Sequence, residues 1–350
     1  MSPLSHLPGS IIIDDPSKVG EARRIAKGLA RRLEFDETSL ENVAIVATEA
    51  ATNLLKFAPG GELIFREIGC DRTDGLEILS VDRGPGMADL ERCLQNGFST
   101  SGTLGGGLGA MVRLSSTFDI HSVPGTGTVS VCRFLGRPDR STERASRVAP
   151  PIELGVVSLP ISGEILNGDG WCVRSESGPV TDLLVVDGLG HGPQAAQAAR
   201  EAIRIFLGRA ATSSLEDLIR LTHEALRATR GAAMAVCRID VRSGSLLFAG
   251  SGKISALIVN PGDDRRINLV SHNGTVGHAI RKIQEFRHPW NRGGLLIMHT
   301  DGLSTRWNLD RYPGLASRHP SIIAGVLFRD DRRPHDDATV LVALDTRSGD

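Results

Sequence analysis

The stretch VVDGLGHGPQAAQAA, residues 185–199, runs from an apolar strand into an alanine-rich helix through Asp187 and three glycines. A tight connection between a strand and a helix needs one glycine, or two, to reach backbone conformations that other residues avoid. The additional glycine and the carboxylate therefore indicate a functional site at this junction, provided that carboxylates elsewhere in the chain complete it.

Three further stretches place acidic residues at the edges of predicted strands. NGDGW contributes Asp169, MHTDGL contributes Asp301, and HDDATV contributes Asp336 and Asp337. Any one of them alone is more typical of an ordinary turn. Together with Asp187 they form four acidic stations at strand ends, which favours hard oxygen ligands for magnesium or manganese rather than a zinc site.

The second half of the chain, which carries all four stations, is rich in predicted strands. Eight apolar segments between residues 154 and 345 have the length and composition of strands, and two helices are expected near 193–208 and 214–229. Many strands around one pair of helices predict a two-sheet β-sandwich flanked by helices.

The first half mixes helices with strands and predicts an α+β layered sandwich. Apolar residues at helical spacing mark helices over 19–33 and 40–55, a further helix begins near Leu108, and a hairpin closes the half across PGTG. The polar segment that follows, rich in Arg, Ser and Pro, is interpreted as a linker. The expected domains are residues 12–136 and 152–346, joined by the linker 137–151.

Three motifs of the first half point to a nucleotide site. TEAATNLLK places Glu49 and Asn53 on one helix face, with Lys56 one turn further on, and a solvent-facing edge is the alternative. SVDRGPGM sets Asp82 after a strand, where a plain turn is the alternative. STSGTLGGGLGAMV leads through glycines into a helix, where backbone amides and the helix N-terminus suit phosphate. The sequence fits neither a Walker A loop, which needs GK[ST], nor a Rossmann fingerprint, whose glycines follow a strand.

Taken in order, these motifs resemble the GHKL (Bergerat) ATPase domain, and residues 17–135 are similar to the small anti-sigma-factor serine/threonine kinases of bacterial partner switching. The resemblance implies ATP with magnesium as cofactor, Asn53 as the magnesium ligand and Glu49 as the general base. It implies that Asp82 binds the adenine amino group, with Thr128 beside it. The other positions that it implies at the nucleotide site are Lys56, Gly84, Gly86, Gly105, Gly107, Leu108 and Gly109.

The four acidic stretches, taken in order, resemble the metal-dependent protein phosphatase (PPM) family, and its SpoIIE-type branch in particular, over about residues 153–345. The resemblance implies two manganese or magnesium ions and a metal-activated water that attacks phosphorus without a covalent phosphoenzyme. The implied ligands are Asp169, Asp187, Asp301, Asp336 and the carbonyl oxygen of Gly188. Asp187 and Asp301 are the implied catalytic residues. Asp337 is an alternative to Asp336, and His191 is interpreted as structural, with a supporting role behind the ligands as its alternative.

Composition narrows the possible partners and the cellular location. The net charge of −1 gives no electrostatic reason to expect nucleic acid or an anionic membrane as the main partner. Five scattered cysteines without a CxxC pair favour reduced thiols. The sequence predicts no signal peptide and no membrane span, so a cytoplasmic protein is expected.

Three functions remain open from the sequence. The first is a bifunctional regulator whose serine kinase and serine/threonine phosphatase act on STAS-type proteins. The second is a phosphatase controlled by a front domain that senses nucleotide without transferring phosphate. The third is an anti-sigma-factor module that binds a sigma factor or a STAS partner, with catalysis secondary. The front half is also a candidate for homodimerisation.

Overall fold

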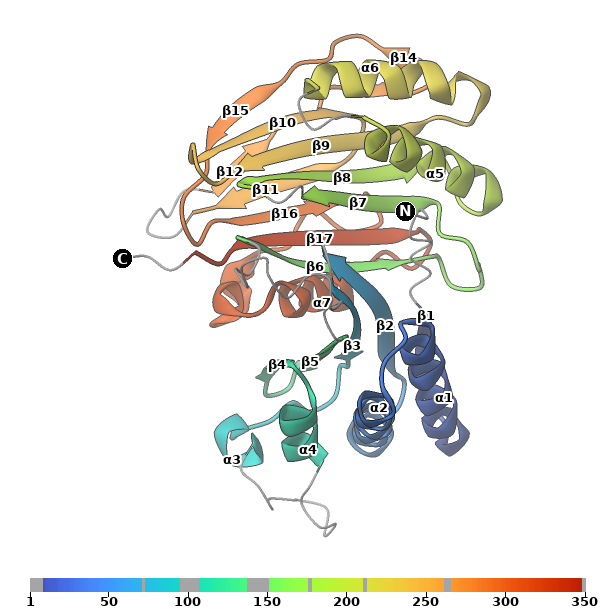
Figure 1. The fold of residues 1–350 in the computed structure, drawn as a ribbon, viewed down its shortest axis with the longest axis vertical. Helices are drawn as coiled ribbons and strands as arrows, with labels where there is room; N and C mark the ends of the chain where they lie inside the picture. The colour runs from blue at the N-terminus through green and yellow to red at the C-terminus, as the bar shows by residue number, and fades with distance from the viewer. Residues whose placement is uncertain are drawn as a thin grey trace. The chain divides into compact units, whose positions relative to one another are not determined.

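The computed structural model describes residues 9–70, 73–94, 107–136, 151–175, 178–209, 213–260 and 266–347 (Figure 1). Backbone contacts divide the chain into two compact units. The first unit comprises residues 2–147 together with 308–329, and the second comprises residues 148–307 together with 330–350. A segment that belongs to the second half by sequence therefore belongs to the first unit by its contacts.

The first unit is built on a five-stranded antiparallel sheet in the order β1-β2-β3-β5-β4. Its strands are β1 (Gly9–Ile13), β2 (Gly61–Cys70), β3 (Thr73–Val81), β4 (Thr117–Val123) and β5 (Gly127–Leu135). Its first-half helices are α1 (Pro16–Arg32), α2 (Glu37–Phe57), α3 (Leu90–Leu94) and α4 (Gly107–Leu114). The predicted helices, strands and closing hairpin are confirmed, whereas β1 was not predicted.

Helices α1 and α2 begin at side-chain caps and pack through small residues. Asp15 accepts a hydrogen bond from the Ser17 amide, and Asp36 accepts one from the Ser39 amide, so each helix N-terminus has a partner for its free amides. The face of α1 that is buried carries Ala22, Ala26 and Ala30, one turn apart. These small side chains let the helix pack closely against α2 and the sheet, where one apolar core joins the helices to strands β2, β3 and β5.

Helix α7 (Pro320–Asp331) covers the other face of the same sheet. Successive strand residues point to opposite faces, so Leu79 and Val129 point away from the core beneath α1 and α2. A Cβ at Gly325 of α7 would lie 2.8 Å from Val129 Cγ1 and 3.2 Å from Leu79 Cδ2, which makes glycine the residue that allows this approach. Every residue from Pro320 to Arg329 is buried, as expected for a helix with apolar residues on all sides. The sequence did not predict this helix.

A buried ionic cluster fixes α7 to the sheet. Glu77 Oε1 accepts hydrogen bonds from Arg66, and its Oε2 accepts one from Arg133 and one from the Ser321 hydroxyl of α7 at 2.7 Å. Burial alone would raise the pKa of Glu77, but the charges of Arg66 and Arg133 outweigh it and lower this pKa to about 2. Before α7, Asp119 of β4 accepts the His319 amide at 2.7 Å. The short helices η3 (Leu309–Arg311) and η4 (Leu315–Ser317) lie in the same segment.

The second unit contains two five-stranded antiparallel sheets, ordered β15-β10-β9-β8-β7 and β12-β11-β16-β17-β6. The strands of the first of these sheets are β7 (Asp169–Ser175), β8 (Val180–Gly188), β9 (Ala232–Asp240), β10 (Ser245–Ser251) and β15 (Phe286–Pro289). Those of the second are β6 (Ile152–Leu159), β11 (Ser255–Val259), β12 (Arg266–Leu269), β16 (Leu295–His299) and β17 (Ala338–Asp345). A small two-stranded sheet pairs β13 (Gly274–Thr275) with β14 (Ala279–Ile280).

The predicted β-sandwich is confirmed. Its core lies between the two sheets and includes Trp171, Phe248 and Leu341. Helices α5 (Pro193–Leu207) and α6 (Leu215–Ala225), followed by η2 (Leu226–Ala228), pack on the outer face of the sheet that contains β8 (Figure 1). All eight predicted strands and both helices are found, and the short elements β12, β13, β14 and β15 are additional.

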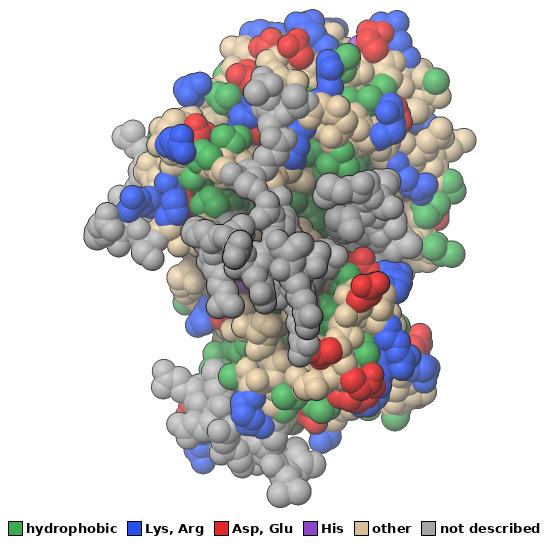
Figure 2. Space-filling model, in the orientation of Figure 1, with side chains coloured by type: hydrophobic (Ala, Val, Ile, Leu, Met, Phe, Trp, Pro, Cys, Tyr) green, Lys and Arg blue, Asp and Glu red, His purple; other side chains and the backbone are tan. Residues whose placement is uncertain are grey.

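The described surface carries charges of both signs. On the face drawn in Figure 2, Lys and Arg side chains are interspersed with Asp and Glu rather than gathered into one basic area. Among the described residues, no helix is long and apolar enough to cross a membrane. Among the cysteines whose side chains the structure describes, Cys93, Cys132, Cys172 and Cys237 are free thiols.

Candidate functional site

The strand pairing of β7 with β8 brings two of the predicted acidic residues together. Asp169 begins β7 and lies directly opposite Asp187 near the end of β8. The next residue, Gly188, donates its amide to the carbonyl oxygen of Gly168 at 3.1 Å. Two residues that are 18 positions apart in sequence are therefore neighbours at one edge of the sandwich.

Asp301 and Asp336 complete an acidic cluster around Asp187. The charges of Asp169, Asp301 and Asp336 all act on Asp187. Burial and then these like charges raise the pKa of Asp187 to about 9. All four predicted acidic positions are therefore close together. They lie at the start of β7, at the ends of β8 and β16, and in the loop before β17.

Asp169 is buried and held by a threonine that the sequence analysis did not single out. The Thr300 hydroxyl donates to Asp169 Oδ2 at 2.7 Å and itself accepts the Thr339 amide at 3.0 Å. Burial, followed by the charges of Asp337 and Asp336, raises the pKa of Asp169 to about 8, against the lowering effect of the Thr300 bond. The hydroxyl thus orients a carboxylate that burial would otherwise disfavour in its charged form.

Asp336 and Asp337 have different surroundings, and this difference helps to decide which of the two is the candidate metal ligand. Asp337 is buried, its Oδ1 accepts the Ile161 amide at 2.7 Å, and its Oδ2 accepts the Gly168 amide at 2.8 Å. Both oxygens of Asp337 therefore bind backbone amides of the loop that precedes β7. Asp336 is half-buried, and its charge acts on Asp169 and Asp187. The geometry favours Asp336 as the ligand and Asp337 as a support for the Asp169 loop.

The three glycines after Asp187 are each required at their position, but for different physical reasons. A Cβ at Gly188 would lie 2.2 Å from the Ala195 carbonyl oxygen, so only glycine allows α5 to pass this close to the strand end. Gly190 and Gly192 have φ values of +84° and +75°, which other residues rarely adopt. His191 between them is exposed, and its Nδ1 lies 3.1 Å from Glu164 Oε1, in agreement with a structural role.

The donor set of the acidic cluster fits a hard dication, although the side chains do not form a closed ligand cage. Among the described residues, no group of three or more His, Cys, Asp or Glu side chains is arranged closely enough to hold a metal ion. Burial and, after it, the like charges of neighbouring carboxylates raise the pKa values of Asp169 and Asp187. Oxygen-only donors with this excess of negative charge are the chemistry that Mg²⁺ or Mn²⁺ requires.

In the first unit, the start of α4 lies against the two polar residues of α2. A Cβ at Gly107 would lie 3.0 Å from Glu49 Oε2 and 3.7 Å from Asn53 Oδ1. Glu49 and Asn53 are half-buried and share one face of α2, as the spacing predicted. Gly107 of the predicted phosphate loop therefore lies beside the predicted base and the predicted magnesium ligand. Gly105, which the resemblance also implies in this loop, lies outside the described residues.

Asp82 is fixed at the end of β3 by backbone amides. Its Oδ1 accepts the amides of Gly84 at 2.8 Å and Thr128 at 3.1 Å. Burial raises the pKa of this carboxyl, and the two amides oppose the shift. A Cβ at Gly127, which the sequence analysis did not consider, would lie 2.1 Å from the Asp82 carbonyl oxygen.

The other residues that the resemblance implies at the nucleotide site differ in burial and in what they contact. Gly86 has a φ of +67°, and its Cβ would lie 2.2 Å from the Val123 carbonyl oxygen, so it is needed for the loop to pass the hairpin. Leu108 packs against the apolar core, and Gly109 is buried in α4. Lys56 is exposed in the last turn of α2. The Thr128 hydroxyl is 2.9 Å from that of Ser122.

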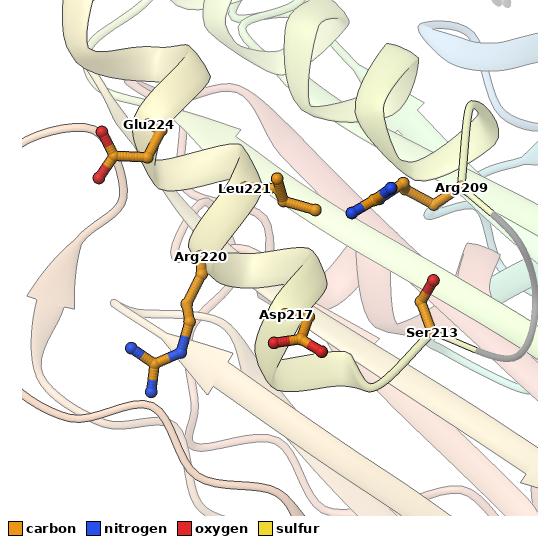
Figure 3. Close-up of a pocket in the computed structure, with 6 residues that line it drawn as sticks. All are labelled: Arg209, Ser213, Asp217, Arg220, Leu221 and Glu224. Carbon is orange, nitrogen blue, oxygen red and sulfur yellow. The ribbon is translucent and has the colours of Figure 1, made fainter.

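A surface hollow of about 320 Å³ lies along α6 and has none of these residues in its wall (Figure 3). Its lining consists of Arg209, Ser213, Asp217, Arg220, Leu221 and Glu224. The candidate catalytic site of the second unit is therefore the group of carboxylates at the strand ends and not this hollow.

Comparisons with known proteins match each half separately. Residues 12–133 match the family described as histidine kinase-like ATPase domain, and residues 178–344 match the stage II sporulation protein E (SpoIIE) family. The serine/threonine-protein kinase RsbT of Bacillus subtilis is 34% identical over 107 residues, which is 31% of this chain and 80% of RsbT. The phosphoserine phosphatase RsbX of Bacillus subtilis is 23% identical over 153 residues, which is 44% of this chain and 75% of RsbX.

A solved structure also resembles the chain. It is described as "The bacterial stressosome: a modular system that has been adapted to control secondary messenger signaling", and the match covers 55% of this chain and 98% of the solved chain. The sequence identity is 30% and the TM-score is 0.50.

Proposed function

Because this chain belongs to the RsbT-like histidine kinase-like ATPase family in its first half and to the SpoIIE phosphatase family in its second, we propose that it adds phosphate to a protein serine at one site and removes it at the other. The names of the two relatives describe inverse reactions, since one is a serine/threonine kinase and the other a phosphoserine phosphatase. Inverse reactions in one chain serve a partner-switching regulator whose target alternates between two states. We propose a STAS-type protein as that target, on the resemblance of both halves to partner-switching enzymes.

One observation supports this proposal: in each half, the carboxylate that we propose as reactive lies beside other residues of the proposed site. Glu49 faces the first residue of α4, where the γ-phosphate of ATP would approach, and Asp187 lies in the acidic cluster of the second unit. A module that only binds nucleotide or a partner has no need for a carboxylate at the position of Glu49. A carboxylate at the position that we propose for the general base therefore supports phosphate transfer over simple binding.

In the kinase site, we assign each residue one task. Asn53 offers an amide oxygen to the magnesium ion of ATP, and Glu49, one helical turn away, accepts the proton of the attacking serine hydroxyl. Asp82 uses Oδ1 for its own loop, which leaves Oδ2 as the acceptor for the adenine amino group. Gly107 brings backbone amides to the phosphates without a side chain that would strike Glu49.

In the phosphatase site, the carboxylates of Asp169, Asp187, Asp301 and Asp336 with the Gly188 carbonyl oxygen would hold two magnesium or manganese ions. Bound there, the ions would supply the activated water for hydrolysis. Thr300 orients Asp169 through its hydroxyl, and Asp337 holds the loop that carries Asp169. Helix α5 passes close to Gly188 and so packs against the strand end that carries this carbonyl group.

We also propose the domain boundaries 12–136 and 152–346, with the difference that residues 308–329 form part of the first unit. The experiment that tests the proposed function is incubation of the purified protein with ATP and candidate STAS proteins, with phosphate on serine followed over time. Wild-type protein should show transient phosphorylation, and Asp187→Asn should show stable phosphorylation.

The second candidate function is a phosphatase whose rate is set by nucleotide in the front domain. The observation that favours it is the position of residues 308–329 in the chain, between the candidate ligands Asp301 and Asp336. Within the first unit, this segment reaches the nucleotide site, because Arg329 donates to the Asp82 carbonyl oxygen. A nucleotide bound at Asp82 could therefore act on the loops that carry Asp301 and Asp336, through the hydrogen bond of Arg329 and the chain that joins Arg329 to these loops. This control is compatible with phosphate transfer, and the two are separated by the experiments below.

A further inference from the structure

A lysine lies beside the acidic cluster of the second unit. Lys253, in the loop between β10 and β11, has its Nζ 3.5 Å from Asp301 Oδ2. Its side chain is 84% exposed, whereas that of Asp301 is 30% exposed. The ammonium group therefore approaches the site from the solvent side, which is the side from which a substrate enters.

The backbone on both sides of Lys253 is fixed. The Gly252 amide donates to the His272 carbonyl oxygen at 2.9 Å, and the Ser271 hydroxyl donates to the Ile254 carbonyl oxygen at 3.0 Å. Gly252 has a φ of +94°, and a Cβ there would lie 2.5 Å from that of Ala233. Lys253 thus has an anchored backbone and a free four-carbon stem.

Stability does not account for a cation at this place. An exposed ion pair of this kind contributes little to the stability of a fold. The chain also uses arginine for most of its basic positions, since only five of the 40 basic residues are lysine. Lys18 and Lys27 pair with glutamates on the helices of the first unit, but Lys253 is the one whose partner is a candidate catalytic residue.

We propose that Lys253 is a substrate-binding residue of the phosphatase site, whose ammonium group binds the phosphoryl oxygens of phosphoserine. The inference rests on the proposed phosphatase function. Metal ions bound at the site would attract the carboxylate of Asp301. The ammonium group of Lys253 would then be free to bind an incoming anion, which its flexible side chain could reach. A phosphate monoester brings two negative charges, which suit a compact cation with three donors. Lys253 neither forms nor breaks a bond in this role.

The test compares Lys253→Gln with Lys253→Arg, and with Lys282→Gln as the matched control. Lys282 is exposed in the same unit and is not part of the site. With p-nitrophenyl phosphate and Mn²⁺, Lys253→Gln should raise KM about tenfold and change kcat by less than about threefold, because one charge-assisted contact is lost. The inhibition constant of inorganic phosphate should rise by the same factor. Lys253→Arg should keep most of the binding, and Lys282→Gln should match the wild type.

Two further measurements keep the inference falsifiable. The dissociation constant of Mn²⁺, obtained by calorimetry without substrate, should stay the same or fall in Lys253→Gln, because a competing cation is removed from Asp301. If Mn²⁺ binds more tightly while KM and the phosphate inhibition constant are unchanged, Lys253 is only a counter-ion and the inference is wrong. Arg333, whose charge acts on Asp336, is the rival cation. If Arg333→Gln alone raises the two constants, Arg333 binds the phosphate instead. A wild type without Mn²⁺-dependent hydrolysis would instead contradict the proposed function itself.

Discussion

Arg329 of α7 donates a hydrogen bond to the backbone oxygen of Asp82 at 3.2 Å, although the two residues are 247 positions apart in sequence. Arg83, next to Asp82, donates in return to the backbone oxygen of Arg329. The loop that carries the candidate adenine ligand is therefore held by the chain segment that connects two acidic loops of the candidate phosphatase site.

This relationship predicts that nucleotide changes the phosphatase rate. ATP or ADP should change kcat/KM for p-nitrophenyl phosphate by about fivefold in the wild type, the lower range of measured coupling between sites. Arg329→Met should keep nucleotide binding within about threefold and reduce this effect to less than about twofold, because the link to Asp82 is lost. Arg227→Met, which breaks an exposed pair with Glu224, is the control and should respond to nucleotide as the wild type does. An unchanged nucleotide response in Arg329→Met would contradict the proposed route.

The buried cluster at Glu77 predicts a specific response to acid. The pKa of Glu77 is about 2 in the folded protein and 4.5 as its ordinary value, so its charged form stabilises the fold above the ordinary value. This contribution, on the order of 3 kcal/mol, should be lost as the pH falls from about 4.5 to about 2. Glu77→Gln should lower the free energy of unfolding at neutral pH and flatten its pH dependence in that window. Urea unfolding at several pH values measures both effects, and an unchanged pH dependence would refute the cluster's contribution.

The hydrogen bond from Thr300 to Asp169 predicts that the Thr300 hydroxyl positions the Asp169 carboxylate. A substitution that keeps the size of the side chain but removes the hydroxyl tests this role. Thr300→Val keeps the shape but removes the hydroxyl that donates to Asp169, so the affinity for Mn²⁺ should fall about tenfold. Thr300→Ser keeps the hydroxyl and should restore most of this affinity. Calorimetric titration with Mn²⁺ measures both variants. Equal Mn²⁺ affinities in Thr300→Val and the wild type would show that the bond does not orient the ligand.

The raised pKa values of Asp169 and Asp187 predict how metal stabilisation depends on pH. Their pKa values, about 8 and about 9, lie above the ordinary value of 3.8, so folding takes up protons at these sites. Their contribution favours the fold below the ordinary value of 3.8 and is lost progressively as the pH rises from there to about 8 and about 9. A bound dication replaces those protons, so the Tm increase caused by Mn²⁺ should be larger near pH 8.5 than near pH 6. Asp187→Asn should remove most of this difference, and an increase in Tm that is independent of pH would contradict the assignment.

The sequence predicted the sites better than it predicted their surroundings. Asp187 and Asp301 lie at the ends of apolar strands and are each followed by a glycine, so strand ends and turn chemistry were enough to propose them as candidates. The choice between Asp336 and Asp337 needed coordinates, because adjacent residues differ only in which backbone amides their side chains meet. Thr300 was missed because a lone threonine before an aspartate has no distinctive pattern.

Helix α7 was missed for a different physical reason. Residues 320–328 are apolar except for Ser321 and are buried on all sides, so they lack the one-sided periodicity that identifies a surface helix. Their packing against the β3 and β5 face of the first unit involves contacts between residues far apart in sequence, such as Glu77 and Ser321, which are 244 positions apart. Local sequence patterns carry no information about such a partner. The same limit applies to β1, whose partner β2 is separated from it by two helices.

The central claim is that one chain both adds and removes phosphate on a protein serine, and one measurement tests it most directly. Purified Asp187→Asn protein is incubated with ATP labelled in the γ-phosphate, magnesium and a STAS-type protein encoded nearby, and label on the STAS serine is followed. Label should accumulate in Asp187→Asn, disappear on addition of wild-type protein with Mn²⁺, and form at least about a hundredfold more slowly in the double variant Glu49→Ala, Asp187→Asn, which retains ATP binding. If Asp187→Asn labels no STAS protein while nucleotide still changes the phosphatase rate of the wild type, the first half is a regulator and not a kinase, and the claim is contradicted.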